Sequence, residues 1–335
     1  MFNLFNTTPM KTKIILASFF IIILTQITFG QITDNESKLR NQKTDTIQGW
    51  KKGGVIVFNL SQTSLTNWAA GGQNSFAVNG LLSGFANYKR DKSIWDNSLD
   101  VGYGLLKQGK NSDYMKTDDR FDFLTKYGRK AYRDFYYAAL FNFKTQMAIG
   151  KDYTKDTVKI SNFLAPAYII GALGMDYIPN AYFSAFIAPL TGKITLVNDQ
   201  QLADAGAFGV KAATYDALGN RLTKGELSNS EFGGYIRIIY SKNDFKNEIL
   251  KGVSFTAKID LFSDYIHNPQ NVVINWENLI ALKVNKYISV NINTDLIYDD
   301  KIKIAFDRNN DGIIDGSGPR VQFKEILGVG FSYKF

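Results

Sequence analysis

The chain has 335 residues, with 39 lysines and arginines against 31 acids, a formal net charge of +8, one histidine and no cysteine. The lack of cysteine excludes a small disulfide-held scaffold and a cysteine nucleophile, and a single histidine cannot form a histidine cluster for zinc. The charge excess is mild. In an exported chain it indicates solvated loops and turns, and not binding to nucleic acid.

The N-terminus has the three zones of a secretory signal peptide. Two lysines precede the apolar run 14–24, and Thr28 and Gly30 are small residues at −3 and −1 of a cleavage site. The apolar run is shorter than the roughly 20 residues that a spanning helix needs. We therefore expect residues 1–30 to be removed on export.

Two regions of different character follow the cleavage site. Residues 31–49 are polar and lack a period, which is typical of a flexible periplasmic lead. From 50 to 335, apolar and polar residues alternate with the period of a β-strand, in which successive side chains point to opposite faces. In 135–147 one face carries Phe135, Tyr137, Ala139, Phe141 and Phe143, and the other carries Asn142, Lys144 and Gln146.

The alternation predicts twelve strands. They lie near 53–66, 74–90, 93–107, 117–130, 134–150, 161–178, 181–193, 230–241, 251–265, 272–284, 287–300 and 321–335. Most run ten residues or more, as tilted transmembrane strands do, whereas strands of soluble domains usually have about five or six. The sequence therefore predicts an all-β fold, a transmembrane antiparallel β-barrel with one face toward lipid.

The connections between these strands alternate in length. Five short links, at 90–93, 129–134, 178–181, 241–250 and 284–287, would be the periplasmic turns of an even-stranded bacterial barrel. The longer connections at 66–74, 107–117, 150–161, 193–230, 265–272 and 300–321 would then all face outward. The stretch 207–222 leaves one alternative open: a further hairpin would make fourteen strands, but we favour an ordered part of a long outer loop.

The inward rows carry charges of both signs. The candidate lumen residues are Asp96, Asp100, Lys144, Arg237, Lys258, Asp260 and Asp295. They fit either a hydrated channel with walls of opposite sign or a lumen filled by cross-strand ion pairs. A barrel of twelve strands lies between side-chain-filled barrels of eight strands and open porins of sixteen, so its size does not decide between the two.

Three tryptophans are candidates for interfacial anchors. Trp68 lies in the glycine-rich segment NWAAGGQN, which lacks the Lys-Ser/Thr ending of a phosphate-binding loop. Trp95 and Trp276 lie on outward rows. Tryptophan favours the boundary between lipid and water, so all three are expected at the barrel's aromatic girdles.

The segment from Asp307 to Asp315 has the D-x-N-x-D-G spacing of a calcium loop. Oxygen ligands would come from Asp307, Asn309, Asp311 and Asp315. Position 12, where a bidentate glutamate belongs, is Gly318, and no helix flanks the segment. Weak Ca²⁺ binding and a plain polar turn both remain open.

The last residues form an alternating strand that ends on an aromatic residue. Phe331, Tyr333 and Phe335 lie in one row with aliphatic residues. This pattern resembles the assembly signal of bacterial outer-membrane β-barrels. It implies the outer membrane of a Gram-negative bacterium, with membrane lipid and the barrel-assembly machinery as partners.

Five short motifs stand in order along the chain. They are Asn67-Trp68-Ala69-Ala70-Gly71-Gly72, Tyr103-Gly104-Leu105, Phe143-Lys144-Thr145-Gln146, Ala165-Pro166-Ala167-Tyr168 and Pro189-Leu190-Thr191-Gly192-Lys193. Together they resemble a domain-of-unknown-function family of exported Bacteroidota proteins that are predicted outer-membrane β-barrels. The resemblance covers roughly 50–335. It implies fold and location, and it brings no activity, substrate or catalytic residue.

Three functions are compatible with these patterns. The first is a narrow passive channel for small polar solutes. The second is a non-conducting structural or partner-binding barrel of an envelope assembly, with the 193–230 loop as its contact. The third is an outer-membrane hydrolase, which would need a Ser–His pair. His267 lies four residues from Ser263, but nearness in a loop is not a triad, and we expect no enzyme and no required cofactor.

Overall fold

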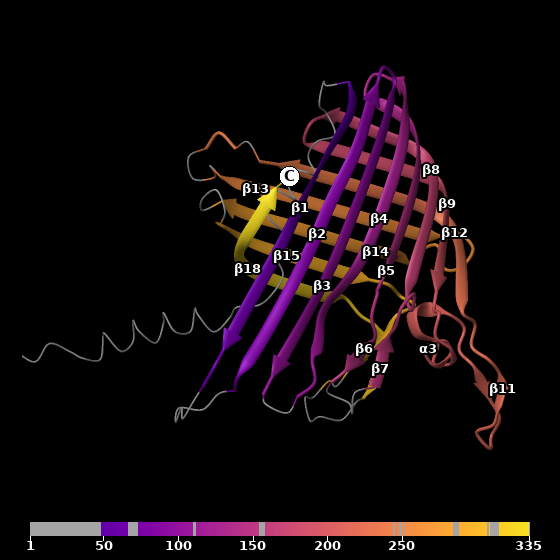
Figure 1. Cartoon of the computed structure of the whole chain (residues 1–335). Helices are drawn as coiled ribbons and strands as arrows, with labels where there is room; N and C mark the ends of the chain where they lie inside the picture. Colours follow the sequence, from indigo (N-terminus) through magenta and orange to yellow (C-terminus); the bar gives the residue numbers. More distant parts are fainter. Residues whose placement is uncertain are drawn as a thin grey trace, which may run out of the picture.

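The barrel is built from twelve long antiparallel strands (Figure 1). The computed structural model describes residues 48–334 except 66–72, 110–111, 154–157, 244, 248–249, 251, 284–287, 307 and 309–314. The barrel strands are β1 (Gly49–Thr63), β2 (Ser75–Arg90), β3 (Ser93–Gln108), β4 (Met115–Tyr132), β5 (Phe135–Thr145), β8 (Ala167–Asn180), β9 (Phe183–Leu196), β12 (Ser228–Lys242), β13 (Val253–Asp264), β14 (Val272–Lys283), β15 (Ile288–Tyr298) and β18 (Gln322–Lys334).

Each barrel strand pairs with the barrel strands before and after it along the chain. The sheet closes where β18 pairs with β1, with Phe331 opposite Phe58 and Lys334 opposite Val55. The predicted number of strands is therefore confirmed. Closure gives the backbone groups of every strand a partner, which a sheet in lipid requires.

The stretch 207–222 contains a hairpin, but this hairpin lies outside the barrel. Its strands are β10 (Thr214–Tyr215) and β11 (Arg221–Thr223), and they follow a short helix α3 (Gln200–Asp204) and a 3-10 turn η2 (Ala207–Gly209). Two further hairpins outside the barrel are β6 (Gly150–Asp152) with β7 (Val158–Ser161), and β16 (Lys303–Phe306) with β17 (Gly316–Pro319).

Some predicted strand ends were wrong. β1 begins at Gly49, inside the segment assigned to the polar lead, and β5 ends at Thr145, where the prediction extended to 150. β8 begins at Ala167, where the prediction began at 161. Pro166 has no N–H group to donate to a sheet, so the barrel strand starts after it. The residues between form the β6–β7 hairpin.

Successive connections lie alternately at the two ends of the barrel, and the connections that contain secondary structure of their own all lie at one end (Figure 1). The loops that hold α3, β6, β7 and β11 are at the lower end of the view. We call this the outer end and the opposite end the inner end. Four inner connections have two to four residues, as predicted, but the β12–β13 connection 243–252 has ten and is longer than the outer connections 109–114 and 265–271. Within the described residues, no helix is both long and apolar enough to cross a membrane.

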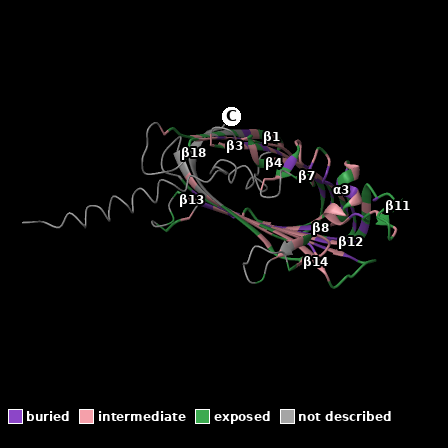
Figure 2. Ribbon diagram, turned by 90° about the horizontal axis from the view of Figure 1, so that it is seen from below, coloured by how far each residue is buried: buried purple, intermediate pink, exposed green. Residues whose placement is uncertain are grey.

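The outside of the barrel is apolar over its middle. Phe58 is 69% exposed and Tyr137 64%, and other large apolar side chains of the outward rows are similarly exposed. Figure 2 views the barrel from the loop end and shows buried residues on β12 and in α3, whereas the hairpin of β11 is exposed. A closed barrel that displays this much apolar surface is a transmembrane barrel.

Aromatic side chains gather near the inner end. The Trp50 ring lies 5.2 Å from Tyr88 and 5.6 Å from Trp95, measured between ring centroids. Trp95, near the inner end, and Trp276, near the middle of β14, both face outward, as predicted, and each is 41% exposed; Trp276 is thus not at an interfacial girdle. Their indole N–H groups donate to Thr125 Oγ1 at 2.8 Å and to Asn278 Oδ1 at 2.9 Å. Neither donor is therefore left unsatisfied on the lipid-facing surface.

The inside of the barrel is less polar than the predicted inward rows. An apolar cluster lies on the lumen side of five neighbouring strands, from β5 to β13. Its buried members are Ala138, Leu140, Ala172, Phe186, Ala188, Tyr235 and Phe262. This part of the lumen is filled by packed side chains.

Candidate functional site in the barrel lumen

Three ion pairs lie on the lumen side of the barrel wall, each between two adjacent strands. They are Lys144 Nζ with Asp122 Oδ2 at 3.4 Å, Arg237 Nη1 with Asp260 Oδ1 at 3.4 Å, and Lys258 Nζ with Glu277 Oε2 at 2.9 Å. In each pair, the two residues stand directly opposite each other on adjacent strands. We call these six residues the septum. Cross-strand neighbours have Cβ atoms about 5 Å apart, so register alone brings each pair together.

The septum separates two cavities. The outer chamber has a volume of about 510 Å³ and the inner chamber about 90 Å³. One residue of each septum pair lines the outer chamber and its partner lines the inner chamber. The outer set is Lys144, Asp260 and Glu277, and the inner set is Asp122, Arg237 and Lys258. The septum therefore lies between the two chambers.

Neutral side chains hold the septum carboxylates in place. The Tyr235 hydroxyl donates to Asp260 Oδ1 at 2.6 Å, and Arg237 Nη1 donates to the same hydroxyl oxygen at 3.2 Å. Asn142 Nδ2 donates to Asp122 Oδ1 at 2.7 Å. A buried charge is tolerated when it is both paired and hydrogen-bonded, so these contacts fix the positions of the charged groups.

The inner chamber is balanced in charge. Lys126 pairs with Asp176 and lies 4.0 Å from Asp96, and the Ser83 hydroxyl donates to Asp100 at 2.5 Å. Three carboxylates and three cations line this chamber: Asp96, Asp100, Asp122, Lys126, Arg237 and Lys258. A solute that enters it meets both signs of charge at short range.

The outer chamber combines charged and apolar walls. Five carboxylates and four cations line it: Asp118, Asp260, Glu277, Asp295, Asp299, Arg120, Lys144, Lys193 and Lys324. Its apolar lining includes Ile170, Phe262 and Ile297 from the strands and Phe208 and Ile302 from the outer loops. The loops therefore cover the chamber with apolar side chains.

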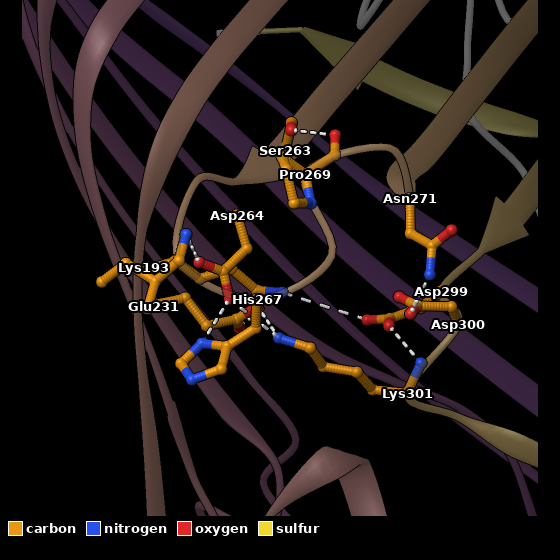
Figure 3. A network of polar contacts seen from close by, with 11 residues as sticks. Lys193, Glu231, Ser263, Asp264, His267, Pro269, Asn271, Asp299, Asp300 and Lys301 are labelled. Carbon is orange, nitrogen blue, oxygen red and sulfur yellow. Dashed lines mark hydrogen bonds and ion pairs between the residues drawn. The ribbon is translucent and has the colours of Figure 1, made fainter.

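A polar network joins the loops to the rim of the barrel (Figure 3). Lys301 comes from the loop after β15, and its ammonium pairs with Glu231 on β12 and with Asp264 Oδ2 at 3.4 Å. Lys193 on β9 pairs with Glu231 at 3.1 Å. Burial lowers the pKa of Lys301, but the hydrogen bond and the charge of Glu231 raise it by more, so its pKa is above the usual range.

The connection between β5 and β8 and the loop between β9 and β12 share a small apolar core. Ala165, Val197, Leu202, Ala203 and Val210 form a buried cluster against which Ala207 and Phe208 pack. Asp199 caps α3, because its side chain accepts hydrogen bonds from the backbone N–H groups of Gln201 and Leu202. Its Oδ2 atom also forms an ion pair with Lys159 Nζ at 2.5 Å. These two connections together form a packed layer over the lumen.

The structure places all seven candidate lumen residues on the two chambers. Asp96, Asp100, Arg237 and Lys258 line the inner chamber, and Lys144, Asp260 and Asp295 line the outer one. Asp295 pairs with Lys324 at 2.6 Å. The sequence did not identify Tyr235, Asp176 or Phe208 as part of the lumen. Inward alternation on β12 could have found Tyr235, whereas nothing in the sequence places Phe208 over the lumen.

The other candidate sites are only partly described. Asp307, Asn309, Asp311, Trp68 and Phe335 lie outside the described residues. Asp315 Oδ2 accepts from the backbone N–H of Arg308 at 2.7 Å, and the described residues hold no group of three or more His, Asp or Glu side chains suited to a metal ion.

Two further candidates can be placed in the structure. Phe331 and Tyr333 lie on β18 opposite Phe58 and Ile56 of β1, so the proposed assembly signal is part of the closing strand. His267 Nδ1 lies 3.3 Å from Asp264 Oδ2, and the Ser263 hydroxyl donates to the carbonyl oxygen of Pro269. Ser263 and His267 therefore have other partners and do not form a nucleophile–base pair with each other.

Comparison with known proteins gives a partial family match. A family model described as a protein of unknown function (DUF3078) matches residues 60–150, which include the end of β1 and all of β2 to β5. The chain matches no curated protein. The family match thus covers about a quarter of the chain, and it includes septum residues of β4 and β5.

Several solved outer-membrane proteins have a distantly similar chain path. An outer membrane channel from Pseudomonas putida F1 is 8% identical over 88% of this chain and 98% of its own, with a TM-score of 0.38. The translocator domain of the autotransporter NalP from Neisseria meningitidis is 11% identical over 97% of this chain and 98% of its own, with a TM-score of 0.33. The β domain of the Bordetella autotransporter BrkA is 9% identical over 86% of this chain and 97% of its own, with a TM-score of 0.30. These scores are too low to argue function from.

Proposed function

We propose that this chain is a narrow passive channel for small polar solutes in the outer membrane of a Gram-negative bacterium. The observation that carries the proposal is the septum, a layer of three ion pairs between two chambers of the same lumen. The motif resemblance supports an origin in the Bacteroidota. Insertion would require membrane lipid and the barrel-assembly machinery, and the proposed role includes no catalysis.

The septum is suited to gating by exchange of partners. Two of its pairs are 3.4 Å apart, longer than the 2.7–2.9 Å of a strong charge-assisted hydrogen bond. A polar solute or a water molecule can replace one partner of a pair and form a hydrogen bond with the charged group that remains. Because both signs are present on both faces, the wild-type channel should select only weakly between cations and anions.

The test is conductance of the purified barrel in a planar lipid bilayer under a KCl gradient. Lys144→Glu removes a cation from the septum and adds an anion. Each unit of charge contributes about 1 kcal/mol at 4 Å in water, so this two-unit change should favour a cation by about 2 kcal/mol, a shift toward cation selectivity of roughly thirtyfold.

The matched control exchanges the two charges. Asp122→Lys combined with Lys144→Glu keeps the pair and the total charge, and it should restore a selectivity near that of the wild type. A correctly folded barrel that never conducts would contradict the channel proposal.

A second candidate function is supported by the tip of the long outer loop. In the β10–β11 hairpin, Leu218 is 87% exposed and Leu222 is 65% exposed. Apolar side chains displayed on a packed loop are typical of a contact with another protein. A non-conducting barrel that binds an envelope protein through residues 193–230 is therefore the alternative, and it is favoured if the protein co-purifies with a partner but never conducts.

A further inference from the structure

The outer chamber is amphipathic along its depth. At its base, the septum presents Lys144, Asp260 and Glu277, with the Tyr235 side chain beside them. The lining also includes the apolar side chains of Ile170, Phe262, Val273 and Ile297, and those of Phe208 and Ile302 from the loops. A volume of about 510 Å³ is within the range of small-molecule sites, which are mostly apolar with a few polar groups that fix orientation.

The charges of this chamber are nearly balanced. Five carboxylates and four cations line it, and the septum presents an ammonium and two carboxylates to its base. A ligand with one charge gains one favourable contact there and meets at least one group of its own sign. A zwitterion can direct its ammonium toward Asp260 or Glu277 and its carboxylate toward Lys144, so that both charged ends are matched.

Phe208 closes the chamber on the side of the loops. It lines the outer chamber and also a further cavity of about 310 Å³ beside the β6–β7 hairpin. Asp118 and Gln146 line both cavities as well, so the two spaces meet at these three residues. Phe208 therefore lies between the chamber and a route toward the outer surface.

The backbone holds Phe208 in an uncommon conformation. Its φ is 58°, and it stands between Gly206 and Gly209, whose φ angles are 69° and 84°. A non-glycine residue with positive φ is uncommon and persists only where the surroundings fix it. Here the packing against the loop core keeps the aromatic ring over the chamber.

We infer that the outer chamber binds small zwitterionic solutes with an apolar side group, such as an aromatic amino acid, and that Phe208 is the residue that contacts this group. The inference rests on the proposed channel and names the class of solute that its lumen favours. The septum supplies the contacts to the two charges, and the apolar wall supplies the contact that a bare ion or a small polyol lacks.

The experiment measures interruption of the single-channel KCl current by four probes added on the loop side. Phenylalanine has both charges and an apolar group, phenethylamine has only the cation, 3-phenylpropionate only the anion, and glycine lacks the apolar group. Phenylalanine should interrupt the current at a rate proportional to its concentration. Each of the other three should bind at least about tenfold more weakly, because one charged contact or the apolar contact is missing.

Two variants locate the site. Phe208→Ala should shorten the phenylalanine interruptions severalfold and leave the weak glycine response unchanged. Leu218→Ala, in the same loop but 87% exposed, is the matched control and should behave as the wild type. Equal interruption by all four probes, or no effect of Phe208→Ala, would overturn the inference while the KCl conductance still supports the channel.

A barrel that does not conduct overturns the channel proposal and is still informative about the chamber. Equilibrium calorimetry with the same four probes then tests binding directly. Preference for phenylalanine that is lost in Phe208→Ala would support the site without a channel, and the absence of any preference would overturn it.

Discussion

Lys301 connects three segments of the outer rim, so its loss is a sharp test of the loop layer. Its ammonium lies between Glu231 and Asp264, whose side chains are 2% and 5% exposed. Lys301→Met would leave two nearly buried carboxylates with one cation fewer. Because the Lys301 side chain is itself 25% exposed, we expect a loss of about 1–3 kcal/mol, less than for a fully buried pair.

The measurement is the free energy of unfolding in detergent, followed by tryptophan fluorescence against denaturant. Lys211→Met is the matched control, because Lys211 pairs with Glu226 at the surface, where the two side chains are 75% and 59% exposed. Its effect should stay below about 0.5 kcal/mol. Equal effects of the two substitutions would show that the rim network does not stabilise the barrel.

Asp199 gives the loop layer a dependence on pH. Burial raises the pKa of this carboxyl, but the hydrogen bonds from Lys159, Asn162 and the Leu202 backbone lower it by more, so its pKa lies below the usual value. A lowered pKa stabilises the folded loop above the unfolded pKa of about 3.9, and this stabilisation is lost as the pH falls through the folded pKa.

Cleavage within 196–228 by an acid protease should therefore increase as the pH is lowered from 5 to 2. Asp199→Asn retains an oxygen that can cap α3 but does not titrate, so its cleavage should vary less over this range. A wild-type cleavage rate that parallels that of Asp199→Asn at every pH would rule out this role for the carboxyl.

Where the pairing of β8, β9 and β12 shifts in register, glycine allows the backbones to approach closely. Register shifts occur next to Gly174 on β8 and next to Gly233 on β12. A Cβ atom at Gly174 would lie 2.0 Å from the carbonyl oxygen of Ile187, and one at Gly233 would lie 1.8 Å from that of Ser263. These contacts are with backbone, so no side-chain movement can relieve them.

Gly174→Ala should therefore reduce the fraction of chain that folds into the heat-resistant form on a gel. Gly171→Ala is the control on the same strand, because a Cβ atom there has nothing within 4 Å. We expect a loss of at least about 3 kcal/mol for Gly174→Ala, as for other overpacked sites of this severity, and little change for Gly171→Ala. Equal folding of the two variants would contradict this description of the bulge.

At the scale of the strands, the sequence was informative where one face was clearly apolar. The alternation in 135–147 and 253–261 predicted both the strands and their inward rows, because Phe141 and Phe255 alternate there with Asn142 and Ser254. On β8 both faces contain apolar residues, so alternation could not show that Ile170 and Ala172 point inward. Bulges also change which residues point inward, and no local pattern reveals them.

The charged residues of the lumen could be predicted, but their pairing could not. Inward rows identified Lys144, Asp260 and Lys258. The choice of partner depends on register, which places Lys258 opposite Glu277 and Arg237 opposite Asp260. The position of Phe208 depends on the packing of a long loop, and the sequence alone did not indicate it.

At the scale of the whole molecule, one closed barrel combines an apolar outside, a charged septum and a packed loop layer. The outside requires lipid, and the outer loops restrict access to the lumen. A passive channel requires that the lumen continue through the septum. If it does, a hydrophilic reagent that enters from the loop side must reach the inner chamber.

The chain contains no cysteine, so a single introduced thiol can report this access without background. Asn275→Cys places a thiol on the outer chamber and Ser98→Cys places one on the inner chamber. The measurement is labelling of each variant, in a membrane, by a small charged thiosulfonate added only on the loop side. Labelling of both positions is the predicted result. Labelling of Asn275→Cys alone, with Ser98→Cys reactive only after unfolding, would show that the septum closes the lumen and would contradict the proposed channel.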